Sequence, residues 1–242
     1  AELYFSGNQK DKAVTNYTFV ISRERNEFTE QALSRVSQIH LERNDFAKAK
    51  PLLERLEKEG TRAQNIIFAQ SNLMKVYYEG ENYQQAVVFA EKVLKDASAD
   101  PRAINDAQSI IARSAMKTGD ETKAKNAYAE VQKTASGQLA AEALYYQAYF
   151  ENKSGAFQQS NATVQKLAKD FSGYKIWGGK GLVVMAKNFY ALKDAFQATY
   201  ILESVIENFA DFQEIVEEAR TELNKIKAEE AKTNASVEAG EN

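Results

Sequence analysis

The chain has 242 residues, of which 44% are apolar and 11% aromatic, so it is long and apolar enough to bury a sizeable core. Its formal net charge of −3 argues against the strongly basic face of a general nucleic-acid-binding protein. The absence of cysteine from the sequence excludes disulfides, thiolate metal sites and a cysteine nucleophile.

A short phrase recurs along the chain and divides it into units of similar length. In each copy a polar break is followed by a marker residue, usually aromatic, and then by a small residue three positions later. The six markers are Lys10, Phe46, Tyr83, Glu121, Phe157 and Phe196. The differences between successive numbers are 36, 37, 38, 36 and 39. Near-constant intervals of this size predict stacked supersecondary units.

Each unit has the pattern of two helices. Within residues 65–80, Leu73, Val76 and Tyr77 share one face of a helix, whereas the residues of a strand would alternate. After a polar break, Asn82 is placed to cap a second helix by accepting backbone N–H bonds. The sequence therefore predicts that every unit is a hairpin of two helices.

The predicted order along the chain has four parts. They are a partial hairpin over residues 1–27, tandem hairpins over 28–210, an amphipathic capping helix over 211–232 and a disordered tail over 233–242. Asp100 followed by Pro101 predicts a helix start. Pro51 predicts a kink or a late start, because proline lacks the N–H of a helix interior. The glycine-rich residues 172–181 predict a flexible connection.

The unit resembles the tetratricopeptide repeat, in which an aromatic residue and a small residue join two antiparallel helices. The residues that carry the resemblance are Tyr77, Tyr78, Asn82, Tyr83, Ala86 and Ala90. Glu121 departs from the pattern at the aromatic position, and Ser160 and Thr199 depart at the small position. The resemblance implies an all-α fold, a right-handed superhelix (α-solenoid) of tandem helix-turn-helix hairpins whose first helices line a concave face.

A second resemblance concerns the last quarter of the chain. Residues 181–209, together with Trp177, are similar to the C-terminal repeats of large tetratricopeptide proteins from bacterial cell envelopes. This resemblance implies the C-terminal piece of a longer exported protein. It favours a periplasmic or cell-envelope location and leaves a cytoplasmic location open.

Few residues point to catalysis or to a cofactor. His40 is the only histidine, so a histidine metal site or dyad lacks its other members and a structural role is expected. Residues 173–181 do not form a phosphate loop, because Gly181 stands where that motif needs Ser or Thr. The sequence predicts no catalytic residue, no metal site and no cofactor. A hydrolase that uses carboxylates from separate units stays open as a third interpretation.

The partner surface is predicted by counting back eight residues from the markers. The resulting positions are Gln38, Lys75, Arg113, Tyr149 and Asn188, and Tyr78 and Tyr145 are further candidates. Tyr and Arg side chains anchor partners by combining apolar area with hydrogen bonds. We therefore expect a non-enzymatic protein-interaction scaffold that presents this concave surface to a peptide or to a partner helix. A patch of Lys75, Arg113 and Tyr149 would favour an acidic segment.

Other expectations follow for partners and for two tyrosines. An alternative function is a structural array that self-associates or continues a longer solenoid in a cell-envelope assembly. No nucleic acid is expected, and no apolar run approaches the roughly 20 residues that cross a bilayer, so no direct membrane insertion is predicted. Tyr83 is expected to be a buried wedge between hairpins, whereas Tyr149 is expected to be exposed for recognition.

Overall fold

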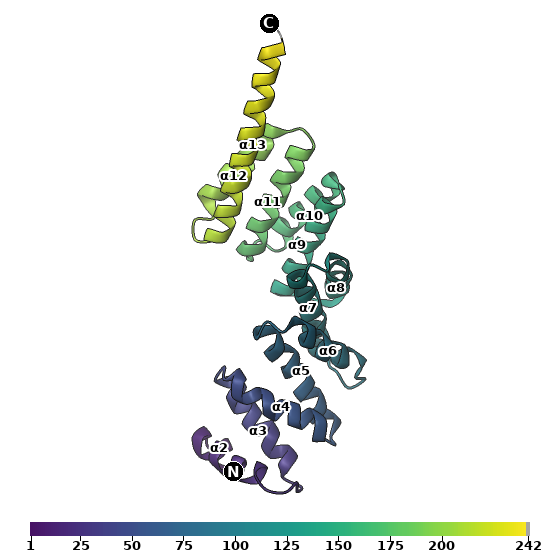
Figure 1. Cartoon of the computed structure of the whole chain (residues 1–242), viewed down its shortest axis with the longest axis vertical. Coiled ribbons are helices and arrows are strands. Elements are labelled where there is room, and N and C mark those ends of the chain that lie inside the picture. The colour runs from purple at the N-terminus through teal and green to yellow at the C-terminus, as the bar shows by residue number, and fades with distance from the viewer. Residues whose placement is uncertain (241–242) are drawn as a thin grey trace. The chain divides into compact units, whose positions relative to one another are not determined.

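The computed structural model describes the backbone of residues 1–240 and the side chains of residues 1–232. This part of the chain contains thirteen α-helices and no strand (Figure 1). The helices are α1 (Glu2–Ser6), α2 (Lys10–Ile21), α3 (Thr29–Glu42), α4 (Phe46–Glu59), α5 (Ala63–Glu79), α6 (Tyr83–Lys95), α7 (Pro101–Thr118), α8 (Glu121–Thr134), α9 (Gly137–Lys153), α10 (Phe157–Asp170), α11 (Lys175–Ala191), α12 (Ala195–Asn208) and α13 (Gln213–Gly240). The predicted α-solenoid of helical hairpins is confirmed.

The helices cluster into two compact units that divide within α8. Unit 1 comprises Ala1–Ala127, and unit 2 begins at Tyr128. In each unit consecutive helices pack on one another, and the first helix of a hairpin also packs on the first helix of the next: α3 on α5 and α5 on α7 in unit 1, α9 on α11 and α11 on α13 in unit 2. Each unit therefore has a face formed by first helices, which we call its first-helix face. The array predicted over residues 28–210 stays a prediction.

The turn inside each hairpin repeats one backbone geometry. The residue before the cap has a positive φ at Asn8, Asn44, Glu81, Gly119, Gly155 and Lys193. The next residue caps the second helix, and in four turns its side-chain oxygen accepts a hydrogen bond from the N–H three residues later: Asp45, Asn82, Asp120 and Asp194. The recurring polar break is thus a left-handed residue followed by an N-cap. Asp100 likewise caps α7, as predicted, by accepting from the N–H of Ala103 at 2.7 Å.

This geometry corrects the register of the last hairpin. α12 begins at Ala195, directly after the cap Asp194, so Ala195 and not Phe196 occupies the marker position. The last interval becomes 195 − 157 = 38 residues. Ala198 is accordingly the fully buried small residue, a role that the sequence assigns to Thr199.

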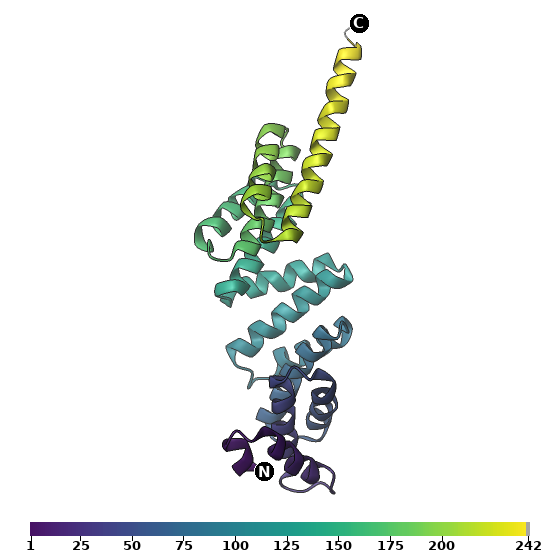
Figure 2. The same cartoon turned by 90° about the vertical axis from the view of Figure 1, so that its left-hand side faces the viewer.

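Three helix boundaries also differ from the prediction. α4 begins at Phe46 and continues through Pro51, so the expected late start is wrong. α11 begins at Lys175, so residues 175–181 of the expected flexible connection are helical. Figure 2 shows α13, in yellow, running on past the other helices of unit 2, and its backbone is helical to Gly240 rather than to residue 232. The tail predicted over 233–242 covers these last turns and residues 241–242, which lie outside the described residues.

Small residues at the helix crossings allow the hairpins to pack closely. Ala49, Ala86 and Ala90 are fully buried. The repeat pattern predicts this for Ala86 and Ala90. The core of unit 1 continues through Leu53, Leu56, Leu73, Met74 and Val93, and that of unit 2 through Val183, Leu202, Val205, Ile215 and Ile226. Each buried aliphatic side chain stabilises its unit by about 1.5 to 3 kcal/mol.

Replacing each of two adjacent glycines in α11 with alanine is expected to change the free energy of unfolding in opposite directions. A Cβ on Gly179 would lie 2.8 Å from ring carbons of Phe209 and 3.1 Å from Ile215, whereas a Cβ on Gly178 would meet no atom within 4 Å. Gly178→Ala should raise the free energy of unfolding by about 1 kcal/mol through helix propensity. Gly179→Ala should lower the free energy of unfolding by about 1 to 2 kcal/mol, because the steric clash with Phe209 and Ile215 outweighs the gain in helix propensity. Urea denaturation measures both, and a stability gain in Gly179→Ala would contradict this packing.

Candidate partner-binding pockets

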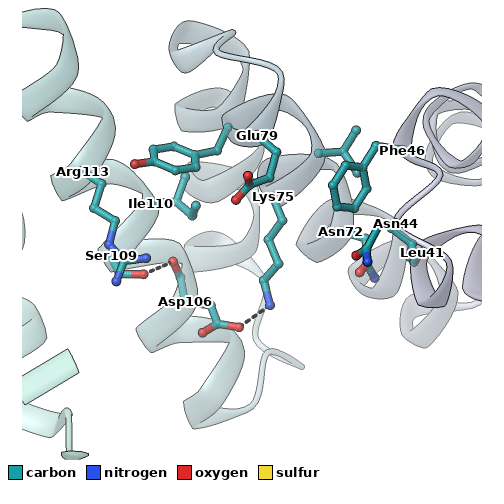
Figure 3. Close-up of a pocket in the computed structure, with 12 residues that line it drawn as sticks. Leu41, Asn44, Phe46, Asn72, Lys75, Glu79, Asp106, Ser109, Ile110 and Arg113 are labelled. Atoms are coloured by element: carbon teal, nitrogen blue, oxygen red, sulfur yellow. Dashed lines mark hydrogen bonds and ion pairs between the residues drawn. The ribbon is translucent and has the colours of Figure 1, made fainter. Parts of the chain in front are cut away.

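The first-helix face of unit 1 contains a pocket of about 660 Å³. Its walls are α5, α7 and the turn from α3 into α4 (Figure 3). The residues that line it are Leu41, Asn44, Phe46, Asn72, Lys75, Val76, Tyr78, Glu79, Asp106, Ser109, Ile110 and Arg113. We call it the unit-1 pocket. Three of the predicted partner-binding residues, Lys75, Tyr78 and Arg113, therefore meet at one place.

An ion pair joins the two main walls of the unit-1 pocket. Nζ of Lys75 on α5 lies 2.5 Å from Oδ2 of Asp106 on α7 (Figure 3). Both side chains are partly exposed, so the pair contributes about 1 kcal/mol at most, but it directs the Lys75 side chain toward α7. The formal charges of Lys75, Arg113, Glu79 and Asp106 cancel. The pocket therefore lacks the net positive charge that an acidic ligand would favour.

Tyr77, and not Tyr83, fills the space between successive hairpins in unit 1. The ring of Tyr77 stacks on Phe89 with centroids 5.5 Å apart, and its hydroxyl donates to Glu54 at 2.5 Å. Burial, reinforced by the Glu54 carboxylate, raises the pKa of Tyr77 to about 12. Tyr83 is only half-buried and packs edge-on against Tyr78 at 5.5 Å. The predicted full burial of Tyr83 is wrong. Tyr77 is half-buried as well, and it is its contacts with Phe89 and Glu54 that place it between the hairpins.

The first-helix face of unit 2 contains a second pocket, of about 510 Å³. Helices α9, α11 and α13 form its walls. The residues that line it are Tyr145, Tyr149, Asn152, Lys153, Val184, Lys187, Tyr190, Ala191, Glu218, Glu222, Lys225 and Ile226. We call it the unit-2 pocket. The predicted residues Tyr145 and Tyr149 both line it. Tyr149 is half-buried rather than exposed, because its ring packs edge-on against Phe150 at 5.2 Å.

Charges and hydroxyl groups are arranged closely around the unit-2 pocket. Nζ of Lys187 lies 2.8 Å from a carboxylate oxygen of Glu218 and 3.5 Å from one of Glu222. The hydroxyl of Tyr190 donates to Glu229 at 2.8 Å, and this hydrogen bond raises the pKa of Tyr190 to about 12. Burial raises the pKa of Tyr145, and the Glu218 carboxylate acts in the same direction. Both phenols are therefore protonated at neutral pH.

Asn188 lines neither pocket, because it is fully buried in unit 2. Its Nδ2 donates to Oγ of Ser160 and to Oδ1 of Asn161, both at 2.8 Å. Its Oδ1 accepts from Nδ2 of Asn152 at 2.7 Å. Ser160, which stands where the repeat has Ala, also donates to the carbonyl of Ala148 at 2.8 Å. These bonds tie α9, α10 and α11 together, so Asn188 has a structural role and its predicted role in partner binding is wrong.

The register of α12 explains why the sequence selects Asn188. Counting back eight residues from Ala195, the true marker, gives Lys187, which lines the unit-2 pocket. Lys187 is thus the residue that sequence reasoning missed, and Asp194, a good N-cap residue directly before Ala195, was the signal that could have found it. Gln38 also lines neither pocket: it is half-buried on α3, where it accepts from Arg35 and donates to Glu42.

Three other features bear on function: the single histidine, metal-binding clusters and membrane-spanning helices. His40 is buried on α3 with Nδ1 at 3.7 Å from Asp45, and burial lowers its pKa although Asp45 opposes this. Among residues whose positions are described, no three His, Cys, Asp or Glu side chains gather in a way that could hold a metal ion. Within the same residues no helix is both long and apolar enough to span a membrane.

Solved structures with a similar fold include tetratricopeptide repeat proteins. YrrB, described as a TPR protein with an unusual peptide-binding site, is 13% identical over 85% of this chain and 97% of its own, with a TM-score of 0.64. TPR-like repeats of a kinesin light chain from Podospora anserina are 17% identical over 78% and 100%, with a TM-score of 0.55. A tetratricopeptide repeat protein from Parabacteroides merdae is 11% identical over 90% and 94%, with a TM-score of 0.52.

The sequence itself gives no comparable match. No family model and no curated protein match this chain. The structural likeness shows that the chain has the fold of tetratricopeptide repeat proteins.

Proposed function

We propose that this chain is a non-enzymatic protein-interaction scaffold that binds an extended peptide, or a helix of a partner protein, on its first-helix faces. The observation that carries the proposal is the meeting of Lys75, Tyr78 and Arg113 at the unit-1 pocket. These side chains come from the first helices of two successive hairpins, and Phe46 of the preceding hairpin completes the wall. A ligand in this pocket would contact three hairpins at once.

The walls of the unit-1 pocket are already ordered before a ligand binds. Its walls are helices whose positions are fixed by the core of unit 1, so the ordering cost of association falls on the ligand. Among proteins of similar fold, YrrB is described as having a peptide-binding site, which supports a peptide as the ligand class.

The lining residues narrow the chemistry of the ligand. Phe46, Tyr78 and Ile110 offer apolar area beside Lys75 and Asp106, which carry opposite charges. A segment with one apolar side chain flanked by charges of both signs would pair with each of these groups. We propose such a mixed-charge segment in place of the purely acidic one expected from the sequence.

Peptide selection on the full chain provides the test. Peptides from a random display library that bind the wild-type chain should bind Lys75→Ala/Tyr78→Ala/Arg113→Ala at least about tenfold more weakly, because an anchor contributes 1.4 kcal/mol or more. The matched control is Lys92→Ala, since Lys92 also bridges hairpins by an ion pair, to Glu57 at 2.6 Å, but lies outside the pocket. The proposal fails if a folded triple variant keeps wild-type affinity, or if the control loses as much.

The alternative function, a solenoid continued by further hairpins, finds less support at α13. Its outward side carries the exposed residues Glu217, Arg220, Thr221 and Asn224. Terminal capping elements of repeat proteins have such a polar outer face, whereas a helix covered by a following hairpin needs apolar area. We propose a capping role for α13. A cell-envelope partner is supported by the resemblance of residues 181–209 alone, and cell fractionation tests it.

A further inference from the structure

α12 carries two large aromatic side chains, Phe196 and Tyr200, that are mostly exposed, and Phe196 also lines a pocket of about 380 Å³ between α12 and α13. α12 packs on α11 and α13 and lies at an edge of unit 2 (Figure 1). Phe196 is 76% exposed and Tyr200 is 63% exposed. Residues four apart on a helix are neighbours on its surface, so the two rings form one apolar patch.

The hairpin fold does not require aromatic residues at these two positions. Phe196 and Tyr200 are the second and sixth residues of α12. The same positions of the other second helices from α4 to α10 hold Ala47 and Pro51, Gln84 and Val88, Thr122 and Asn126, and Gln158 and Ala162. All eight are exposed, and none is aromatic. A pair of rings placed in water at this one hairpin marks an interaction surface.

The charges beside the two rings are arranged symmetrically. Lys193 lies five residues before Ala198 and Glu203 five residues after it, while Phe196 and Tyr200 each lie two residues from it. Lys193 has no ion-pair partner among the described residues, and Glu203 has only an exposed pair with Lys227 at 2.9 Å. Lys193 lies in the turn before α12 and Glu203 lies on the helix, so the order along the chain is cation, ring, ring, carboxylate.

We propose that two copies of this chain associate through α12 in an antiparallel arrangement. A two-fold axis at Ala198 would set Phe196 against the partner's Tyr200, and Lys193 against the partner's Glu203. Every contact then occurs twice, as an isologous interface requires. An anionic membrane would be repelled by Glu203, and a purely basic segment by Lys193, whereas a second copy presents both charges in the opposite order.

The size of the patch sets the strength of the association. An aromatic side chain buries about 150 to 250 Å² when it is fully covered, so four largely exposed rings supply roughly 500 Å². Added rim contacts bring the total to the small end of specific interfaces, near 1,000 Å². The dimer should be weak and should dissociate on dilution.

Sedimentation equilibrium of the full chain over a concentration series tests the proposal. The wild type should show a reversible monomer–dimer equilibrium. Phe196→Gln/Tyr200→Asn, which installs residue types found at equivalent positions, should weaken association at least tenfold. Phe19→Gln is the control, because Phe19 is 61% exposed on α2 and should leave the dissociation constant unchanged.

Charge reversal tests the antiparallel arrangement itself. Lys193→Glu and Glu203→Lys should each weaken the dimer, because like charges would face each other across the axis. The double variant Lys193→Glu/Glu203→Lys should recover wild-type association. A wild type that stays monomeric at every concentration, a dimer that survives loss of both rings, or a double reversal no tighter than the single ones would overturn the proposal.

Discussion

Truncation of Tyr77 to alanine is expected to lower the free energy of unfolding by about 3 kcal/mol or more. The ring of Tyr77 joins two hairpins of unit 1: it stacks on Phe89 of α6, and Nζ of Lys50 on α4 lies 4.4 Å from its centroid. Its hydroxyl also donates to Glu54 on α4. The alanine variant loses ring packing on both sides and the hydrogen bond, and urea denaturation measures the loss.

Two further variants distinguish the contribution of the Tyr77 ring from that of its hydroxyl and from that of Tyr83. Tyr77→Phe should cost about 1.5 to 3 kcal/mol, the range for a hydrogen bond to a charged group. Tyr83→Ala should cost only about 1 kcal/mol, because its ring packs edge-on against Tyr78, whereas the equally half-buried Tyr77 stacks on Phe89 and hydrogen-bonds to Glu54. Equal losses for Tyr77→Ala and Tyr83→Ala would show that Tyr77 does not join the hairpins.

Replacing Asn188 with leucine is expected to lower the free energy of unfolding by about 3 kcal/mol. Leucine has a similar branched shape but is larger, and it leaves the amide of Asn161 and the hydroxyl of Ser160 without the hydrogen bonds that Asn188 makes. An unsatisfied buried polar group costs about 1 to 3 kcal/mol. Asn152 loses its acceptor as well, although it is only half-buried.

The control for this prediction is the adjacent residue. Lys187→Leu should cost about 1 kcal/mol at most, because the Lys187 ion pairs are partly exposed. In Asn188→Leu/Ser160→Ala the loss should be smaller than the sum of the two single losses, since alanine no longer has a hydroxyl to satisfy. Additive losses, or a Lys187→Leu loss as large as that of Asn188→Leu, would contradict the buried network.

The sequence by itself determined the number, order and type of the hairpins. Helix periodicity and capping are local properties, so Leu73 and Val76 in α5, the cap Asn82 and the start of α7 at Pro101 could be predicted without knowledge of contacts. The placement of Lys75, Tyr78 and Arg113 on first helices could also be predicted, and the three side chains line a common pocket.

Only the tertiary structure decided which side chains are buried and which charges are paired. Lys75 meets Asp106, and Tyr77 meets Glu54, because separate hairpins pack together, and no spacing along the chain specifies these contacts. In the last hairpin the register is set locally by the cap Asp194, but its effect on burial appears only in the packed structure. One residue turns a helix position by about 100°, so a shift of one exchanges Lys187, which lines the unit-2 pocket, for Asn188, which lies in the core.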